Sequence, residues 1–109
     1  MTTKELSGLL SLTVFAEGDQ PPREITGCYI CDLLSWVMGR APAGCAWITV
    51  MQNANVAAVA LLADVSCVIL TEGIRPDEAL AARAAQKGIA LFGWEQDAYA
   101  LACRMQALL

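Results

Sequence analysis

The sequence predicts an α/β fold, a three-layer α/β/α sandwich with a mostly parallel sheet of four to five strands. Two observations lead to this fold class. From Ala46 to Leu109, apolar strand-like runs alternate with segments of helical pattern in the order β-α-β-α-β-α. The strand-like runs are continuously apolar, which is typical of parallel strands covered on both faces. A length of 109 residues fits one domain over residues 1–109.

Caps and turns define the elements of the first half. Thr2 and Glu5 have the spacing of a capping box, and leucines at helical spacing follow them. Asp32 is a favoured N-cap residue and is expected to cap the helix after it. The expected order is a helix over Thr3–Leu10, a strand over Leu12–Phe15, a loop over Glu17–Arg23, a β-favouring segment over Glu24–Ile30, a helix over Leu33–Gly39 and a loop over Arg40–Gly44.

The second half is more regular. Pro76 suits the first turn of a helix, and Gly88 suits the position just after its end. In the last helix, Tyr99, Ala102, Cys103 and Leu108 are candidates for the inner face. The expected order is a strand over Ala46–Val50, a polar bend over Met51–Asn55, a helix over Val56–Ala63, a strand over Ser66–Leu70, a loop over Thr71–Arg75, a helix over Pro76–Lys87, a strand over Ile89–Phe92 and a helix over Glu95–Leu108.

Composition excludes several classes of protein. Hydrophobic residues make up 57% of the chain and charged residues 17%, which excludes intrinsic disorder. A formal net charge of −4 and scattered basic residues argue against nucleic-acid binding. Without histidine there is no His-based acid–base catalysis and no imidazole metal ligand. No apolar run is long enough to span a membrane and no signal peptide is evident, so a cytoplasmic protein without a membrane partner is expected.

The apolar excess also predicts self-association. A small domain leaves much of its chain at the surface, and large apolar patches there usually mark interfaces. We therefore expect a homodimer, because closed two-fold symmetry is the commonest soluble arrangement. Trp36 and Trp47 are candidate anchors of the contact, since aromatic residues are enriched in interface cores.

Cys28 and Cys31 have the only spacing that resembles a redox or metal motif. If they lie on or next to a strand, positions three apart point to opposite faces. Buried structural thiols are therefore the favoured interpretation, with no metal and no cofactor. A redox or metallocofactor role for the pair stays open as the alternative.

Polar residues follow the ends of the predicted parallel strands. The carboxyl ends of such strands meet at one edge, where open α/β folds bind ligands. Polar loop residues are also expected at any strand end, so ordinary turns and caps are the competing interpretation. For Asp32 that interpretation is the helix cap. The candidate ligand-binding residues are Asp32, Gln52, Asn53, Asn55, Thr71, Glu72 and Gly73, followed by Gly93 and Trp94 after the last strand.

Three segments resemble the DRTGG domain family. They are Asp32-Leu-Leu-Ser-Trp-Val-Met38, then Trp47-Ile-Thr-Val50 with Asn55-Val-Ala-Ala-Val59, then Val68-Ile-Leu-Thr-Glu-Gly73 with Pro76. The resemblance implies a three-layer α/β/α sandwich that self-associates. Such domains are similar to the N-terminal domain of HPr kinase/phosphorylase, occur between CBS domains, and also stand alone, in some cases encoded near iron-only hydrogenases.

This chain departs from the residues that give the family its name. Gln52 and Asn53 stand where Asp and Arg are expected, Glu72 replaces the first Gly, and Thr71 and Gly73 are kept. The phosphate loop of HPr kinase is absent as well. The leading hypothesis is a non-enzymatic regulatory or interaction module. In its narrower form, this module senses a small ligand at the strand-end edge. An accessory role in redox or metallocofactor metabolism is the runner-up, and a small enzyme is the third hypothesis.

Overall fold

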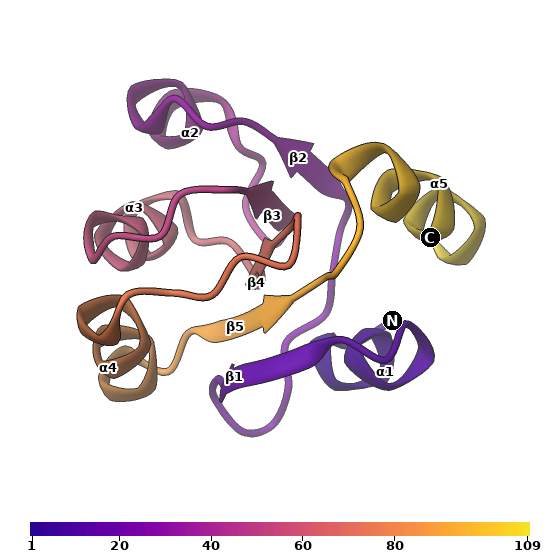
Figure 1. Cartoon of the computed structure of the whole chain (residues 1–109), viewed down its shortest axis with the longest axis horizontal. Helices are drawn as coiled ribbons and strands as arrows, with labels where there is room; N and C mark the ends of the chain where they lie inside the picture. Colours follow the sequence, from indigo (N-terminus) through magenta and orange to yellow (C-terminus); the bar gives the residue numbers. More distant parts are fainter.

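One sheet of five strands organises the molecule. The computed structural model describes all 109 residues, and the strand order is β1-β5-β4-β3-β2. Strands β2 to β5 are parallel, and β1 pairs antiparallel with β5 at one edge (Figure 1). The α/β fold class with a mostly parallel sheet is therefore confirmed. The strands are β1 (Thr13–Glu17), β2 (Cys28–Ile30), β3 (Ala46–Thr49), β4 (Cys67–Leu70) and β5 (Ala90–Gly93).

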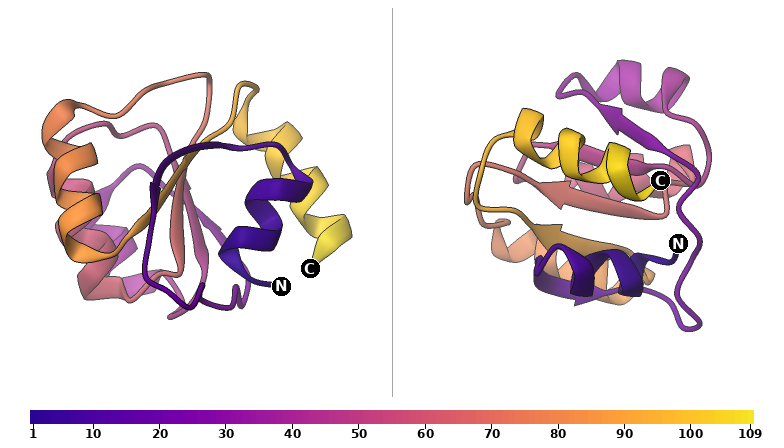
Figure 2. Two further views of the ribbon diagram at one scale, coloured as in Figure 1. Left: turned by 90° about the horizontal axis from the view of Figure 1, so that it is seen from below. Right: turned by 90° about the vertical axis from the view of Figure 1, so that its right-hand side faces the viewer.

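Helices cover both faces of the sheet and make the three layers. α2 (Leu34–Arg40), α3 (Asn55–Ala63) and α4 (Glu78–Lys87) lie on one face, while α1 (Thr3–Leu9) and α5 (Ala98–Leu108) lie on the other (Figures 1 and 2). Both chain ends lie on the α1 and α5 side (Figure 2). No helix is long and apolar enough to cross a bilayer.

The core consists of two apolar clusters, one on each face of the sheet. Because side chains alternate along a strand, neighbouring residues of one strand join different clusters. Trp47 and Val68 belong to the cluster under α2, α3 and α4, whereas Ile48 and Ile69 belong to the cluster under α1 and α5. All residues of β3 to β5 are buried, as their continuous apolar sequence predicted.

Two predicted helix ends are confirmed. Thr2 and Glu5 form the capping box: the Thr2 backbone N–H donates to Glu5 Oε1 at 3.0 Å, and the Glu5 N–H donates to Thr2 Oγ1 at 3.1 Å. The hydrogen bond from the Thr2 backbone N–H holds the pKa of the Glu5 carboxyl below its usual value. Gly88 ends α4 in the left-handed conformation, with a φ of 69°.

Other boundaries differ from the prediction. Within the β-favouring segment, only Cys28–Ile30 forms a strand. α4 begins at Glu78 rather than Pro76, because Asp77 is extended and its N–H donates to Gln52 O. α5 begins at Ala98 rather than Glu95, because the Asp97 carboxylate accepts from the Ala100 N–H and caps the helix there.

The predicted inner face of α5 is wrong for Tyr99 and Cys103, which are both exposed. Leu101 and Met105, one helical turn apart, are the residues that pack into the core. Trp47 is wrong as an interface anchor, since it is fully buried and its Nε1 donates to Cys31 O at 2.9 Å. Trp36 remains half exposed on α2.

Candidate functional site

Asp32 holds the end of β2 against the end of β3. Its Oδ1 accepts from Thr49 Oγ1 at 2.8 Å and from the Val50 backbone N–H at 3.1 Å. The Thr49 side chain is buried, and its hydroxyl also accepts from the Met51 N–H. Asp32 is therefore no helix cap: Leu33 occupies the N-cap position of α2, without any side-chain cap bond. The carboxylate instead fixes the strand-end edge.

The loops after β3 and β4 are joined in the same way. Gln52 Nε2 donates to Arg75 O at 2.7 Å, and the Asp77 N–H donates back to Gln52 O at 3.0 Å. Asn53 plays a local role, since its Oδ1 accepts from the Asn55 N–H at the first turn of α3. Turn and cap geometry thus accounts for the hydrogen bonds of both asparagines.

A tight turn follows β4. The Ile74 N–H donates to Thr71 O at 3.2 Å, and the two central residues, Glu72 and Gly73, have φ angles of 64° and 67°. Two positive φ angles at the centre are the pattern of a type I′ turn, which favours glycine at both places. Glu72 therefore holds a left-handed conformation that costs a side-chain-bearing residue about 1–2 kcal/mol.

The same turn is tied to the loop after β5. The Glu72 N–H donates to Gln96 O at 2.7 Å, and the Gly73 N–H donates to Trp94 O at 3.0 Å. A β-carbon on Gly73 would lie 3.0 Å from Glu95 Oε2, so the Glu95 side chain covers this glycine. Both turn N–H groups are thus engaged within the protein, which leaves neither of them to bind an anion.

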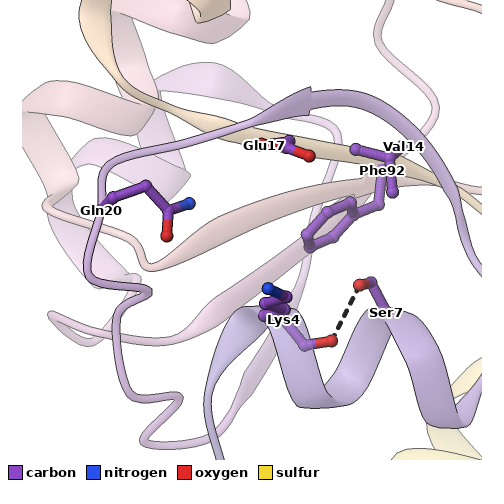
Figure 3. A pocket seen from close by; sticks show the side chains of 6 residues that line it. All are labelled: Lys4, Ser7, Val14, Glu17, Gln20 and Phe92. Carbon is purple, nitrogen blue, oxygen red and sulfur yellow. Dashed lines mark hydrogen bonds between the residues drawn. The ribbon is translucent and has the colours of Figure 1, made fainter.

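The structure brings the predicted site residues to one edge of the sheet. A cavity of about 140 Å³ at this edge is lined by Gly93 and Trp94, the candidates that follow β5, together with Glu95 and Gln96, and by none of the other candidates. A larger cavity of about 250 Å³ opens at the β1 side of the sheet, between α1 and β1 (Figure 3). The strand-end edge is consequently a polar surface held together by cross-loop hydrogen bonds.

Cys28 and Cys31 do not form one site. Tyr29 and Cys31 pack against the cluster under α2 and α3, while the Cys28 thiol lies 3.4 Å from Met105 Sδ on α5. The two thiols point to opposite faces, as predicted, but Cys28 is exposed and Cys31 is only half-buried, so the prediction of two buried thiols is wrong. Partial burial raises the pKa of the Cys28 thiol, which lowers its reactive thiolate fraction. No group of three Cys, Asp or Glu side chains is placed to hold a metal ion.

A family model described as the DRTGG domain matches residues 9–108. The chain belongs to the DRTGG domain family. Both central positions of the Thr71–Ile74 turn have positive φ, which favours glycine at each of them. In this DRTGG domain Glu72 occupies the first of them.

The DRTGG fold also appears in a comparison with solved structures. The chain is similar to the crystal structure of the CBS and DRTGG domains of the regulatory region of Clostridium perfringens pyrophosphatase, complexed with the activator diadenosine tetraphosphate. The TM-score is 0.72 at 17% sequence identity, over 94% of this chain and 44% of that chain. This DRTGG domain therefore spans less than half of the pyrophosphatase region. No curated protein matches the sequence.

Sequence reasoning missed Thr49 and Gln96 at this DRTGG edge, and it named Trp94 without the role of its carbonyl. Thr49 and the carbonyls of Trp94 and Gln96 supply its main hydrogen bonds. A threonine ending an otherwise apolar strand was the available signal for Thr49. The Trp94 and Gln96 carbonyls carry no sequence signal, because every residue has one.

Proposed function

We propose that this DRTGG domain is a non-enzymatic regulatory module that acts as a homodimer. The observation that carries the proposal is an exposed apolar surface at the β2 edge of the sheet, next to the strand-end edge. β2 is a three-residue edge strand with one side unpaired, and Ile30 on it is 49% exposed. Leu33 and Trp36, at the start of α2, are also about half exposed. Ile30 points to the face that carries α5, so the surface on the α2 side is formed by Leu33, Trp36 and Arg40, which we call the β2–α2 patch.

The β2–α2 patch carries one cation and lies next to one exposed anion. Arg40 stacks over the Trp36 ring at 3.8 Å from its centroid, which holds the guanidinium on the patch. Asp32 precedes α2 at the other end of the same segment and is exposed. Because a two-fold interface joins the same surface of both copies, an anion and a cation within one patch can pair twice. The second copy is therefore the occupant that fits this surface.

The regulatory part of the proposal rests on the family and on the solved relative. The pyrophosphatase structure is described as a regulatory region bound to an activator, and its DRTGG domain has the fold of this chain. The narrower hypothesis places a small ligand at the strand-end edge, where Asp32, Gln52, Asn53, Asn55, Thr71, Glu72 and Gly73 gather. The hydrogen bonds between the loops support this hypothesis. A ligand that breaks or strengthens them would change how the ends of β2, β3, β4 and β5 are held together.

Two measurements test the proposal. Sedimentation equilibrium at micromolar concentration should give twice the 11.6 kDa mass of one chain. A thermal-shift screen, with diadenosine tetraphosphate among the probes, tests the ligand hypothesis, since a ligand selective for the native state raises the melting temperature. A monomer across the concentration range would overturn the dimer. A stabilising ligand whose effect survives Asp32→Ala and Gln52→Ala would overturn the edge as its site.

A further inference from the structure

A cavity of about 250 Å³ lies on the opposite side of the molecule from the β2–α2 patch. Its walls come from α1, β1, β5 and the loop after β1 (Figure 3). The volume lies below the roughly 300–1,000 Å³ of pockets for drug-sized ligands, so it suits a small metabolite. The lining residues are Lys4, Ser7, Val14, Glu17, Gln20 and Phe92.

A β-bulge builds one wall of the cavity. The register of β1 against β5 shifts between Val14 and Ala16, so that Val14 pairs with Phe92 and Glu17 pairs with Ala90. In a regular strand, residues three apart point to opposite faces. The extra residue of the bulge restores Val14 and Glu17 to the same face, the one that carries α1.

The bulge thereby places an apolar floor beside a carboxylate. Phe92 is 2% exposed and closes the bottom of the cavity, and Val14 adjoins it (Figure 3). Gly18 follows Glu17 with a φ of 85° and packs so closely on Ala90 that a β-carbon would meet its backbone nitrogen at 2.7 Å. This turn brings Gln20 to the rim of the cavity.

The opposite wall carries a free ammonium group. Lys4 and Ser7 lie one turn apart on α1 and both face the cavity (Figure 3). The two ion pairs of the structure join the Met1 ammonium to Glu24 and Arg23 to Asp64. Lys4 and Glu17 therefore flank the cavity with opposite charges that no side chain neutralises.

We propose that this cavity binds a free α-amino acid with an apolar side chain. The α-carboxylate contacts the Lys4 ammonium, and the α-ammonium contacts the Glu17 carboxylate and the Gln20 side-chain oxygen. The apolar side chain lies on Val14 and Phe92. A ligand that lacks either charge leaves one of the two wall charges unpaired, so the site selects a zwitterion.

NMR titration of the isotope-labelled protein with L-leucine tests the proposal. We expect saturable amide shifts in α1, β1 and the 18–20 turn, at a dissociation constant in the millimolar range or below. Isocaproate, which lacks the amine, and isoamylamine, which lacks the carboxylate, should each bind at least about fivefold more weakly, because each loses a charge-assisted hydrogen bond. Equal binding of all three compounds, or shifts confined to the strand-end edge, would refute the assignment.

Matched variants locate the two charges. Lys4→Gln and Glu17→Gln should each weaken leucine binding about fivefold or more, whereas Lys87→Gln and Glu78→Gln, both on exposed positions of α4, should leave it unchanged. The amide spectrum of each free variant shows whether it is folded. Leucine affinity that is unaltered in folded Lys4→Gln and Glu17→Gln would overturn the proposal, and so would the absence of any saturable shift in the unmodified protein.

Discussion

The Asp32 carboxylate accepts a hydrogen bond from the buried Thr49 hydroxyl at 2.8 Å, and thereby joins an exposed loop to the interior of the sheet. A second bond, from the Val50 N–H, uses the same oxygen. The carboxylate thus satisfies two donors at the end of β3, while the rest of the side chain faces solvent. Its contribution to stability is separable from any contribution to binding.

Asp32→Ala should destabilise the fold by about 2 kcal/mol, because a buried hydroxyl loses its acceptor. Asp32→Asn keeps an oxygen in the same place and should cost less than about half as much. Urea denaturation measures both free energies of unfolding. Asp77→Ala is the control, since Asp77 makes no side-chain cap bond and its loss should cost little. Equal losses in Asp32→Ala and Asp32→Asn would contradict this role.

Glu72→Gly should stabilise the protein. Glycine removes the left-handed strain of about 1–2 kcal/mol at φ 64°. Its greater freedom in the unfolded chain lowers the free energy of unfolding by roughly 0.5–1 kcal/mol and so offsets part of this stabilisation. A net gain of about 0.5–1 kcal/mol should raise the melting temperature by a few degrees in calorimetry.

Gly73→Ala is the matched opposite. Its φ is 67°, and the new β-carbon would press on Glu95 Oε2 at 3.0 Å, so we expect a loss of about 1 kcal/mol or more. If glycine at position 72 lowered the melting temperature, the turn assignment would be wrong.

Trp36→Ala should shift the protein from dimer to monomer at micromolar concentration, because truncation of a central aromatic anchor typically costs 2 kcal/mol or more of binding free energy. Sedimentation equilibrium gives the mass directly. Tyr99→Ala is the control, since Tyr99 is more exposed than Trp36 but lies on α5, outside the β2–α2 patch. A dimer that survives the first substitution and dissociates with the second would move the interface to α5.

Stability should fall in alkaline solution because of buried thiols. Burial raises the pKa of Cys45 from 9.0 to about 11 and raises that of Cys67 as well. The folded chain then keeps protons that the unfolded chain releases, so the contribution is fully present below pH 9.0 and is lost as pH rises towards 11. Each thiol adds a slope of about 1.4 kcal/mol per pH unit in that window.

Denaturation of Cys45→Ala at several pH values isolates this contribution. The variant should be less stable at pH 8, because a small cavity replaces the sulfur, but its free energy of unfolding should decline less steeply above pH 9. If the free energy of unfolding fell with pH equally steeply in the variant and in the unmodified protein, the Cys45 thiol would have the same pKa in the folded and the unfolded chain, and the prediction would be wrong.

Replacing Cys28 and Cys31 together by Ser should leave the zinc and iron content of the purified protein unchanged. The two thiols point to opposite faces and have no further ligands beside them. Elemental analysis of protein prepared without added metal measures the content. Stoichiometric metal that disappears in the double variant would favour the metallocofactor role over the regulatory one.

The order of elements in the second half was predictable because its strands are apolar throughout, although α4 and α5 begin at Glu78 and Ala98 rather than at Pro76 and Glu95. Asp32 shows why local rules failed elsewhere: its preference for helix N-caps was overridden by Thr49, which is distant in sequence. The strand-end residues were predicted to converge, and they do. Their closure by backbone carbonyls of the β5–α5 loop was not predictable, since main-chain acceptors are common to all residues.

The cavity beside α1 was also beyond sequence reasoning. It depends on the bulge at Phe15, which shifts the register by one residue and so reverses the face of Glu17. The strand predicted over Leu12–Phe15 ends before Glu17, so the prediction left Glu17 in a loop, whereas β1 includes it.

Both ends of the chain emerge from the layer formed by α1 and α5 (Figure 2). A label attached at either end would therefore lie beside α1 and α5. The layer of α2, α3 and α4 would stay uncovered and free to act as a platform for assembly.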